Sequence, residues 1–154
     1  MGEIDILISK IRECDSDVWV AGPQNEAAIF ELERAIGVSI PPTYRHFLAH
    51  YGGFGIANSF ISGIIEGEPL GDGTGWLYSD TMRFREEYRM PENLLVVQPD
   101  EGAPYCLDTS CRRSDGECPV VCYELHSRHV GRMAETFGEW LQEWLKLRLA
   151  DHAR

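Results

Sequence analysis

Ser39-Ile-Pro-Pro-Thr-Tyr-Arg-His-Phe-Leu-Ala-His-Tyr-Gly-Gly53 combines a helix start, an apolar stripe and a helix stop. Proline suits the first turn of a helix and not its interior, so Pro41 and Pro42 indicate that a helix begins here. Gly52 and Gly53 end it, and we expect one of them to be left-handed. Between the two prolines and the two glycines, four large apolar residues recur at the spacing of one helix face. They are Tyr44, Phe47, Leu48 and Tyr51.

Other segments on either side of this helix also carry a helical period. Asn25 is a suitable N-cap for one of them and Ser79 for another, and Thr136 with Glu139 fits a capping box. Trp140 and Trp144 fall at core spacing, which favours burial over ligand stacking. The predicted helices cover residues 3–13, 26–36, 79–88 and from 137 onward.

No clear strand is predicted before residue 55. Residues 55–65 are β-prone and suggest one or two strands, and three further runs read as strands that pair sequentially and antiparallel. These runs are Leu94–Val97, Tyr105–Asp108 and Val120–Leu125. Between the two groups, residues 66–75 are acidic and rich in glycine, without the spacing of a phosphate-binding loop. We expect a flexible, exposed loop there.

Length and charge narrow the classes of function. The chain has 154 residues, which is most simply one domain over 1–154, and its net charge is −11. Such a charge disfavours nucleic-acid binding and is compatible with a basic protein partner, although solubility alone also explains it. Neither a secretory start nor a membrane-spanning apolar run is present, which predicts a cytoplasmic protein without a membrane partner. The five cysteines are expected to be reduced thiols.

Possible metal ligands are concentrated between residues 106 and 129. They are Cys106, Cys111, Cys118, Cys122, His126 and His129, and no Cys-x-x-Cys pair is present, so the signal for a structural zinc site is weak. His46 and His50 lie four residues apart on the central helix, off its apolar face, and are expected on the surface. Glu86 and Glu87 are adjacent on a helix and do not face one site. We therefore predict no metal, no cofactor and no catalytic residue.

The amino-acid sequences of several predicted elements resemble those of the SUKH superfamily, in the branch named after a yeast regulator of cell-wall assembly. The resemblance covers about residues 19–145. Its stretches are Glu26 to Gly37, Ile40-Pro41 with Tyr44-Arg45 and Phe47-Leu48, Gly52-Gly53, Tyr105-Cys106-Leu107-Asp108 before Pro119-Val120-Val121, and Phe137 with Trp140-Leu141. Two features depart from the family: Tyr51 stands where Asn is commoner, and the Cys- and Arg-rich loop Cys111–Cys118 is not expected.

The resemblance implies an α+β fold, with N-terminal helices and a C-terminal helix flanking a mainly antiparallel sheet. Bacterial members of the family are mostly immunity proteins, which bind a toxin domain, often a nuclease, without chemistry of their own. The first hypothesis is therefore an immunity protein with a basic cognate toxin as its partner. The alternatives are a regulatory or scaffolding module and, least favoured, a metal protein or enzyme that uses the Cys/His set.

Exposed acidic loops are the predicted contacts for a basic toxin, because an acidic inhibitor gains association rate and complementarity against a phosphate-binding surface. Trp76 is the predicted aromatic anchor among them. The predicted partner-binding residues are Glu66, Glu68, Asp72, Trp76, Asp100 and Glu101. Each acidic residue is equally well explained as a solvated loop charge.

Overall fold

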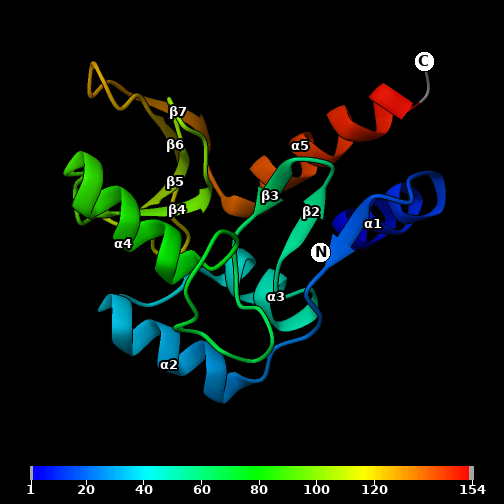
Figure 1. The fold of residues 1–154 in the computed structure, drawn as a ribbon, viewed down its shortest axis with the longest axis horizontal. Coiled ribbons are helices and arrows are strands. Elements are labelled where there is room, and N and C mark those ends of the chain that lie inside the picture. The colour runs from blue at the N-terminus through cyan, green and yellow to red at the C-terminus, as the bar shows by residue number, and fades with distance from the viewer. Residues whose placement is uncertain (1, 153–154) are drawn as a thin grey trace.

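The computed structural model describes residues 2–152, within which helices precede and follow two antiparallel sheets (Figure 1). The α+β class implied by the resemblance is confirmed. The helices are α1 (Gly2–Cys14), α2 (Glu26–Ile36), α3 (Pro42–His50), α4 (Leu77–Tyr88) and α5 (Phe137–His152). The strands are β1 (Val18–Val20), β2 (Phe54–Ile56), β3 (Ser59–Ile61), β4 (Leu94–Gln98), β5 (Tyr105–Asp108), β6 (Val120–Tyr123) and β7 (Val130–Ala134).

Helix α3 is the predicted central helix, and its apolar face lies in the core: Tyr44, Phe47 and Leu48 are all fully buried. Its N-cap residue, Pro41, has no side-chain acceptor. Glu117 supplies one from the loop before β6, since its Oε1 accepts hydrogen bonds from the Thr43 amide at 3.4 Å and the Thr43 hydroxyl at 3.1 Å. The Cys- and Arg-rich loop that departs from the family pattern therefore leads into a cap of the central helix.

The C-terminal end of α3 passes very close to the chain after β3. Gly52 has a φ of +73°, which confirms the expected left-handed glycine. A Cβ atom added to Gly63 would lie 1.6 Å from the Gly52 carbonyl oxygen. The Ile64 amide donates to that same oxygen at 2.9 Å. Glycine is therefore required at residue 52 for its backbone conformation and at residue 63 for space.

The second sheet, in the order β4-β5-β6-β7, is covered on both faces by helices. One face packs against α4 in a cluster that includes Phe84, Val96 and Tyr123. The other face joins the main core, where Leu95 and Val120 meet residues of α3 and α5. Burial on both faces explains why β4 reads as an uninterrupted apolar run. β7 is different, because three of its five residues are exposed.

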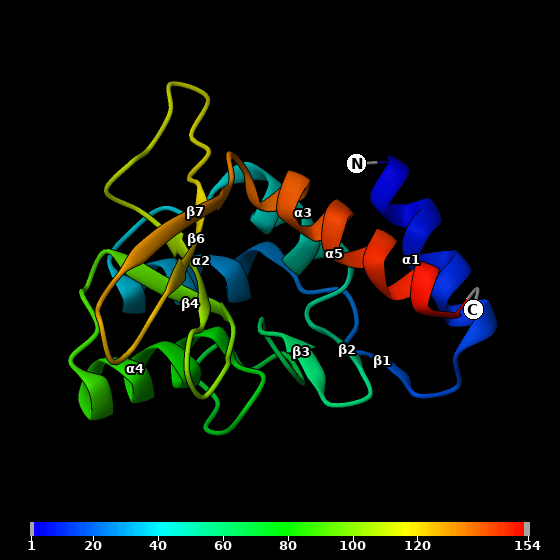
Figure 2. The same cartoon turned by 90° about the horizontal axis from the view of Figure 1, so that it is seen from above.

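Helices α1 and α5 come from opposite ends of the described chain and pack side by side (Figures 1 and 2). The inner side of α1 consists of Ile4, Leu7, Ile8 and Ile11, all buried in the main core. From α5, Leu141, Trp144 and Leu145 enter the same core, so the two tryptophans predicted as core residues are confirmed there. Among the described residues, no helix has both the length and the apolarity needed to cross a membrane.

Three local expectations were wrong. A strand, β1, precedes α2, although no strand was expected before residue 55, and β7 was not predicted at all. Ser79 does not cap α4, which begins two residues earlier, at Leu77. The Ser79 hydroxyl instead accepts a hydrogen bond from the Gly73 amide at 2.9 Å, because the preceding loop folds back over the first turn of the helix.

Candidate functional site

The base of the acidic loop is tied to the central helix by a buried chain of hydrogen bonds. The Tyr44 hydroxyl donates to the Ser62 carbonyl oxygen at 2.6 Å. The Ser62 hydroxyl donates to Asp80 Oδ2 at 2.6 Å, and the Gly75 amide donates to the same oxygen at 3.1 Å. The Gly63 amide also donates to the Gly75 carbonyl at 2.8 Å, which closes the loop at its neck. We call Tyr44, Ser62 and Asp80 the buried network.

The buried network holds an ionisable group almost without water, since Asp80 is only 1% exposed. Burial raises the pKa of the Asp80 carboxyl, although hydrogen bonds from Ser62 and Gly75 and the charge of Arg83 act in the opposite direction. Burial, and after it the Asp80 charge, raises the pKa of Tyr44. The Tyr44 hydroxyl thus keeps its proton at neutral pH and continues to donate to Ser62.

The loop above this neck carries the predicted residues Glu66, Glu68 and Asp72, all of which are exposed. It is not the flexible linker that its composition suggested, because it is closed by internal hydrogen bonds. Trp76 Nε1 donates to the Glu68 carbonyl at 2.9 Å, and its indole fills the space beside Gly71. The Trp76 ring is therefore engaged within the loop, and its predicted role as a partner anchor stays a prediction.

Two surface hollows bring part of the predicted set together. The first, of about 540 Å³, lies between the loop and α4 and includes Asp72. The second, of about 690 Å³, lies between α4, β3 and the turn after β4, and includes Asp100 and Glu101. Thr74 and Arg83 line both hollows, so the two adjoin. Glu66, Glu68 and Trp76 line neither hollow, so the loop divides the predicted residues into two groups.

The first sheet places two aromatic side chains beside these hollows. Trp19, Gly55 and Phe60 are direct neighbours across β1, β2 and β3 and therefore share one face of the sheet. A Cβ atom on Gly55 would lie 2.8 Å from the Phe60 ring and 3.4 Å from the Trp19 ring, so both rings rest over the glycine. Trp19 is 37% exposed, and Phe60 also lines the second hollow.

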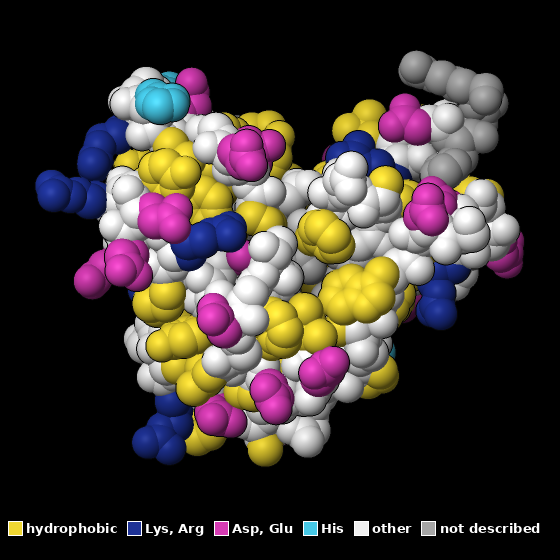
Figure 3. All heavy atoms as spheres, viewed as in Figure 1, with side chains coloured by type: hydrophobic (Ala, Val, Ile, Leu, Met, Phe, Trp, Pro, Cys, Tyr) yellow, Lys and Arg dark blue, Asp and Glu magenta, His cyan; other side chains and the backbone are white. Residues whose placement is uncertain are grey.

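These features form one surface, which we call the aromatic–acidic face. In Figure 3 hydrophobic side chains occupy the middle of this side of the molecule, with Asp and Glu side chains below and beside them. Around the hollows, five carboxylates surround the single guanidinium of Arg83. The face comprises Trp19, Phe60, Asp72, Arg83, Glu86, Glu87, Asp100 and Glu101.

Trp19 and Phe60 were not among the predicted contact residues. A signal for Trp19 was present, because in Val18-Trp19-Val20 a strand must turn the tryptophan away from the two valines. Both valines pack against the main core, and Trp19 faces outward. Phe60 alternates in the same way with the fully buried Ile61, and its exposed side becomes apparent only once the sheet is known.

Among the described residues, the cysteines and histidines lie in no group that could hold a metal ion. All five cysteines are free, and within residues 2–152 no group of three or more Cys, His, Asp or Glu side chains has the geometry to hold a metal ion. Burial raises the pKa of the Cys106, Cys118 and Cys122 thiols, which keeps them protonated and poorly nucleophilic at neutral pH. The rings of His46 and His50 stack 3.9 Å apart, and burial with the His50 charge lowers the pKa of His46.

The described residues thus form an α+β fold in which two aromatic rings lie beside acidic hollows. The family model SUKH_5, described as SMI1-KNR4 cell-wall, matches residues 4–146, and the chain belongs to this family. The match extends the resemblance seen in the sequence, which began near residue 19, back into α1.

A crystal structure of a protein from Pseudomonas syringae pv. tomato is similar to this chain. The two share 17% sequence identity with a TM-score of 0.52, over 75% of this chain and 81% of that one. At this level of identity the similarity concerns the fold alone.

Proposed function

We propose that this chain is an immunity protein that binds a basic toxin domain, such as a nuclease, and covers its substrate groove. A nuclease must be basic where it holds phosphates, and an acidic inhibitor gains association rate and complementarity at that surface. The observation that carries the proposal is the aromatic–acidic face, where the exposed Trp19 and the partly exposed Phe60 adjoin five carboxylates. Aromatic residues are enriched in protein interfaces, and Trp is enriched at binding hot spots. A nuclease would meet its nucleic acid in the cytoplasm, where we place this protein.

Membership of the family supports this proposal, because bacterial relatives are mostly of the immunity type. A second candidate is a regulatory or scaffolding module, which the cell-wall description of the family favours. The two candidates differ in the partner: the first requires a protein that is toxic when produced alone, and the second a partner that is harmless.

The test begins with a pull-down from the organism's own lysate, followed by production of each captured protein with and without this chain. A basic domain that stops growth alone and is tolerated in the presence of the chain supports immunity. Capture of harmless partners only would overturn it in favour of a scaffold. A zinc assay on the purified chain tests the metal alternative directly.

The role of the acidic loop is tested by association kinetics with the captured domain at low salt. Replacing Glu66, Glu68 and Asp72 together by Lys is expected to slow association at least tenfold, because local steering is reversed. The matched control reverses three exposed charges elsewhere, as Glu13→Lys, Glu31→Lys and Asp151→Lys. An equal effect of both triple variants would show that only net charge matters.

A further inference from the structure

The sheet β4-β5-β6-β7 has one edge that the protein covers and one that it leaves open. At β4, the Ser62 amide donates to the Val97 carbonyl at 2.7 Å, and the Val96 amide donates to Thr81 Oγ1 at 3.0 Å. At β7, no backbone hydrogen bond among the described residues joins the strand to any segment except β6. An exposed strand edge of this kind is a template for pairing with another extended chain.

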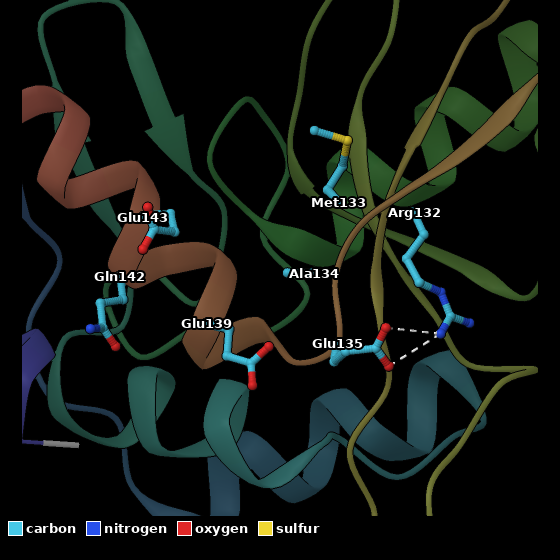
Figure 4. Close-up of a pocket in the computed structure, with 7 residues that line it drawn as sticks. All are labelled: Arg132, Met133, Ala134, Glu135, Glu139, Gln142 and Glu143. Atoms are coloured by element: carbon cyan, nitrogen blue, oxygen red, sulfur yellow. Dashed lines mark hydrogen bonds and ion pairs between the residues drawn. The ribbon is translucent and has the colours of Figure 1, made fainter.

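The open edge is also one wall of a groove. Figure 4 shows the lining residues on β7 and on the first turns of α5, with Glu139 pointing from α5 towards the β7 side and with Arg132 and Glu135 pointing towards each other. The hollow measures about 660 Å³. We call it the β7–α5 groove, and it is lined by Arg132, Met133, Ala134, Glu135, Glu139, Gln142 and Glu143. It lies apart from the aromatic–acidic face and shares no lining residue with it.

The side chains around the edge combine apolar and acidic character. Val130 is 46% exposed and Met133 is 52% exposed, which leaves apolar surface along β7 without a partner. Arg132 Nη1 lies 3.2 Å from both carboxylate oxygens of Glu135, so its charge is compensated within the groove. Glu139 adds a further carboxylate that has no ion pair of its own among the described residues.

We propose that the β7–α5 groove binds an extended, basic segment of a partner protein, which adds a strand antiparallel or parallel to β7. Backbone groups of β7 would supply hydrogen bonds, and the carboxylates of α5 would select Lys or Arg at alternate positions of the added strand. β7 has five residues, so the pairing spans about 17 Å at ~3.3 Å a residue. The inference does not depend on whether the partner is a toxin.

A second copy of this chain is the other occupant that the edge could take, and charge argues against it. Pairing β7 with itself would bring two acidic grooves together on chains that each carry a net charge of −11. A basic segment meets the same edge with charge complementarity.

The test uses the intact chain and a defined probe, the capped heptapeptide Lys-Val-Lys-Val-Arg-Val-Lys. Nuclear magnetic resonance titration is expected to shift the amide signals of residues 130–134 and to slow their hydrogen exchange. A second peptide of the same sequence carries N-methyl groups on alternate backbone amides, so it keeps the charge and loses strand hydrogen bonds. Its affinity is expected to fall at least tenfold, as is that of the peptide with Glu in place of Lys and Arg.

Protein variants complete the test. Glu139→Lys with Glu143→Lys should weaken binding of the first peptide at least tenfold, whereas the matched control Glu13→Lys with Glu31→Lys should not. Equal binding of the N-methylated peptide, shifts centred on residues 66–76 or 99–101, or no binding at millimolar peptide would each overturn the proposal. A dimer in analytical ultracentrifugation with β7 already protected from exchange would overturn it in favour of self-pairing.

Discussion

In the aromatic–acidic face, exposed rings and carboxylates stand on a network that is buried and fully bonded, whereas the β7–α5 groove is lined by exposed side chains along an open strand. The Ser62 to Asp80 hydrogen bond of 2.6 Å and the neck between Gly63 and Gly75 fix the loop of the first surface. In the second surface, the pair between Arg132 and Glu135 is the internal contact, and both partners are about half exposed.

This difference separates two modes of recognition. A face held by buried contacts presents side chains in fixed positions, so binding there depends on individual residues and on the support beneath them. A strand edge presents backbone groups, which every sequence has, so single side-chain substitutions should matter less there than changes to the backbone. The following substitutions test this contrast in order of decreasing effect.

The largest effect is expected from Gly63→Ala, which disturbs the backbone at the neck of the loop beneath the aromatic–acidic face. The new Cβ would lie 1.6 Å from the Gly52 carbonyl oxygen, and backbone rather than a flexible side chain must move. We expect a loss of about 4 kcal/mol or more in the free energy of unfolding, measured by urea denaturation. Gly102→Ala is the control, because its nearest neighbour would be 3.8 Å away. A loss below about 1 kcal/mol at residue 63 would contradict the tight crossing.

Asp80→Ala should be the next most damaging change. It leaves the Ser62 hydroxyl and the Gly75 amide without their buried acceptor, which costs about 2–3 kcal/mol. Asp80→Asn keeps one acceptor oxygen and should lose less. Glu87→Ala on the exposed side of α4 serves as the control and should change stability by less than about 0.5 kcal/mol. If all three variants unfold at the same denaturant concentration, the buried network does not support the loop.

Trp19→Ala and Phe60→Ala should act on binding more than on folding. Each removes a partly exposed ring from the aromatic–acidic face. The loss of a hot-spot residue costs about 2 kcal/mol of binding free energy, which raises the dissociation constant roughly thirtyfold. Calorimetric titration with the captured partner measures this change. Phe30→Ala is the control, since that ring is 59% exposed on α2 and lines neither hollow. Unchanged affinity for both variants would move the interface elsewhere.

The pH dependence of stability should reveal the buried carboxyl of Asp80 with a smaller effect. Because the folded protein raises the pKa of Asp80, it favours the protonated form. That contribution to stability is fully present below the unfolded pKa near 4 and is lost as the pH rises through the higher folded pKa. The stability of the wild type relative to Asp80→Asn should therefore decrease from pH 4 towards neutral pH. An increase over this range would mean that Arg83 and the hydrogen bonds outweigh burial.

Glu135→Gln should have the smallest effect on stability. It breaks an ion pair whose members are both about half exposed, and such pairs contribute less than about 0.5 kcal/mol. Thermal unfolding should be nearly unchanged. A large loss would show that the β7–α5 groove, like the aromatic–acidic face, is held by its own side chains, and the contrast between the two surfaces would disappear.

Much of the fold was predictable because burial leaves a pattern in the sequence. The spacing of Tyr44, Phe47 and Leu48 predicted α3, and the apolar run Leu94–Val97 predicted the strand β4, which the structure buries on both faces. β7 was missed for the opposite reason: Val130-Gly-Arg-Met-Ala134 lies at an edge, is largely exposed and shows no apolar alternation. The groove beside it was invisible for the same reason.

The acidic character of the candidate site could be predicted from the sequence, whereas its shape could not. Exposed acidic loops could be located from composition, and Asp72, Asp100 and Glu101 do come to one surface. The alignment of Trp19 with Gly55 and Phe60 depends on the register between β1 and β2, whose paired residues lie more than 30 positions apart, and no local pattern encodes that register. The buried network likewise joins residues 44, 62 and 80 through contacts that no local sequence pattern predicts.

The packing of α1 against α5 has a consequence during synthesis. Ile4, Leu7, Ile8 and Ile11 leave the ribosome well before α5, the helix that covers them. At roughly 5–20 residues per second, the interval is on the order of ten seconds. Through that time the nascent chain displays an apolar helix, so folding cannot be completed until translation of α5 is nearly finished. A message truncated before residue 137 would yield a chaperone client and not a partly working protein.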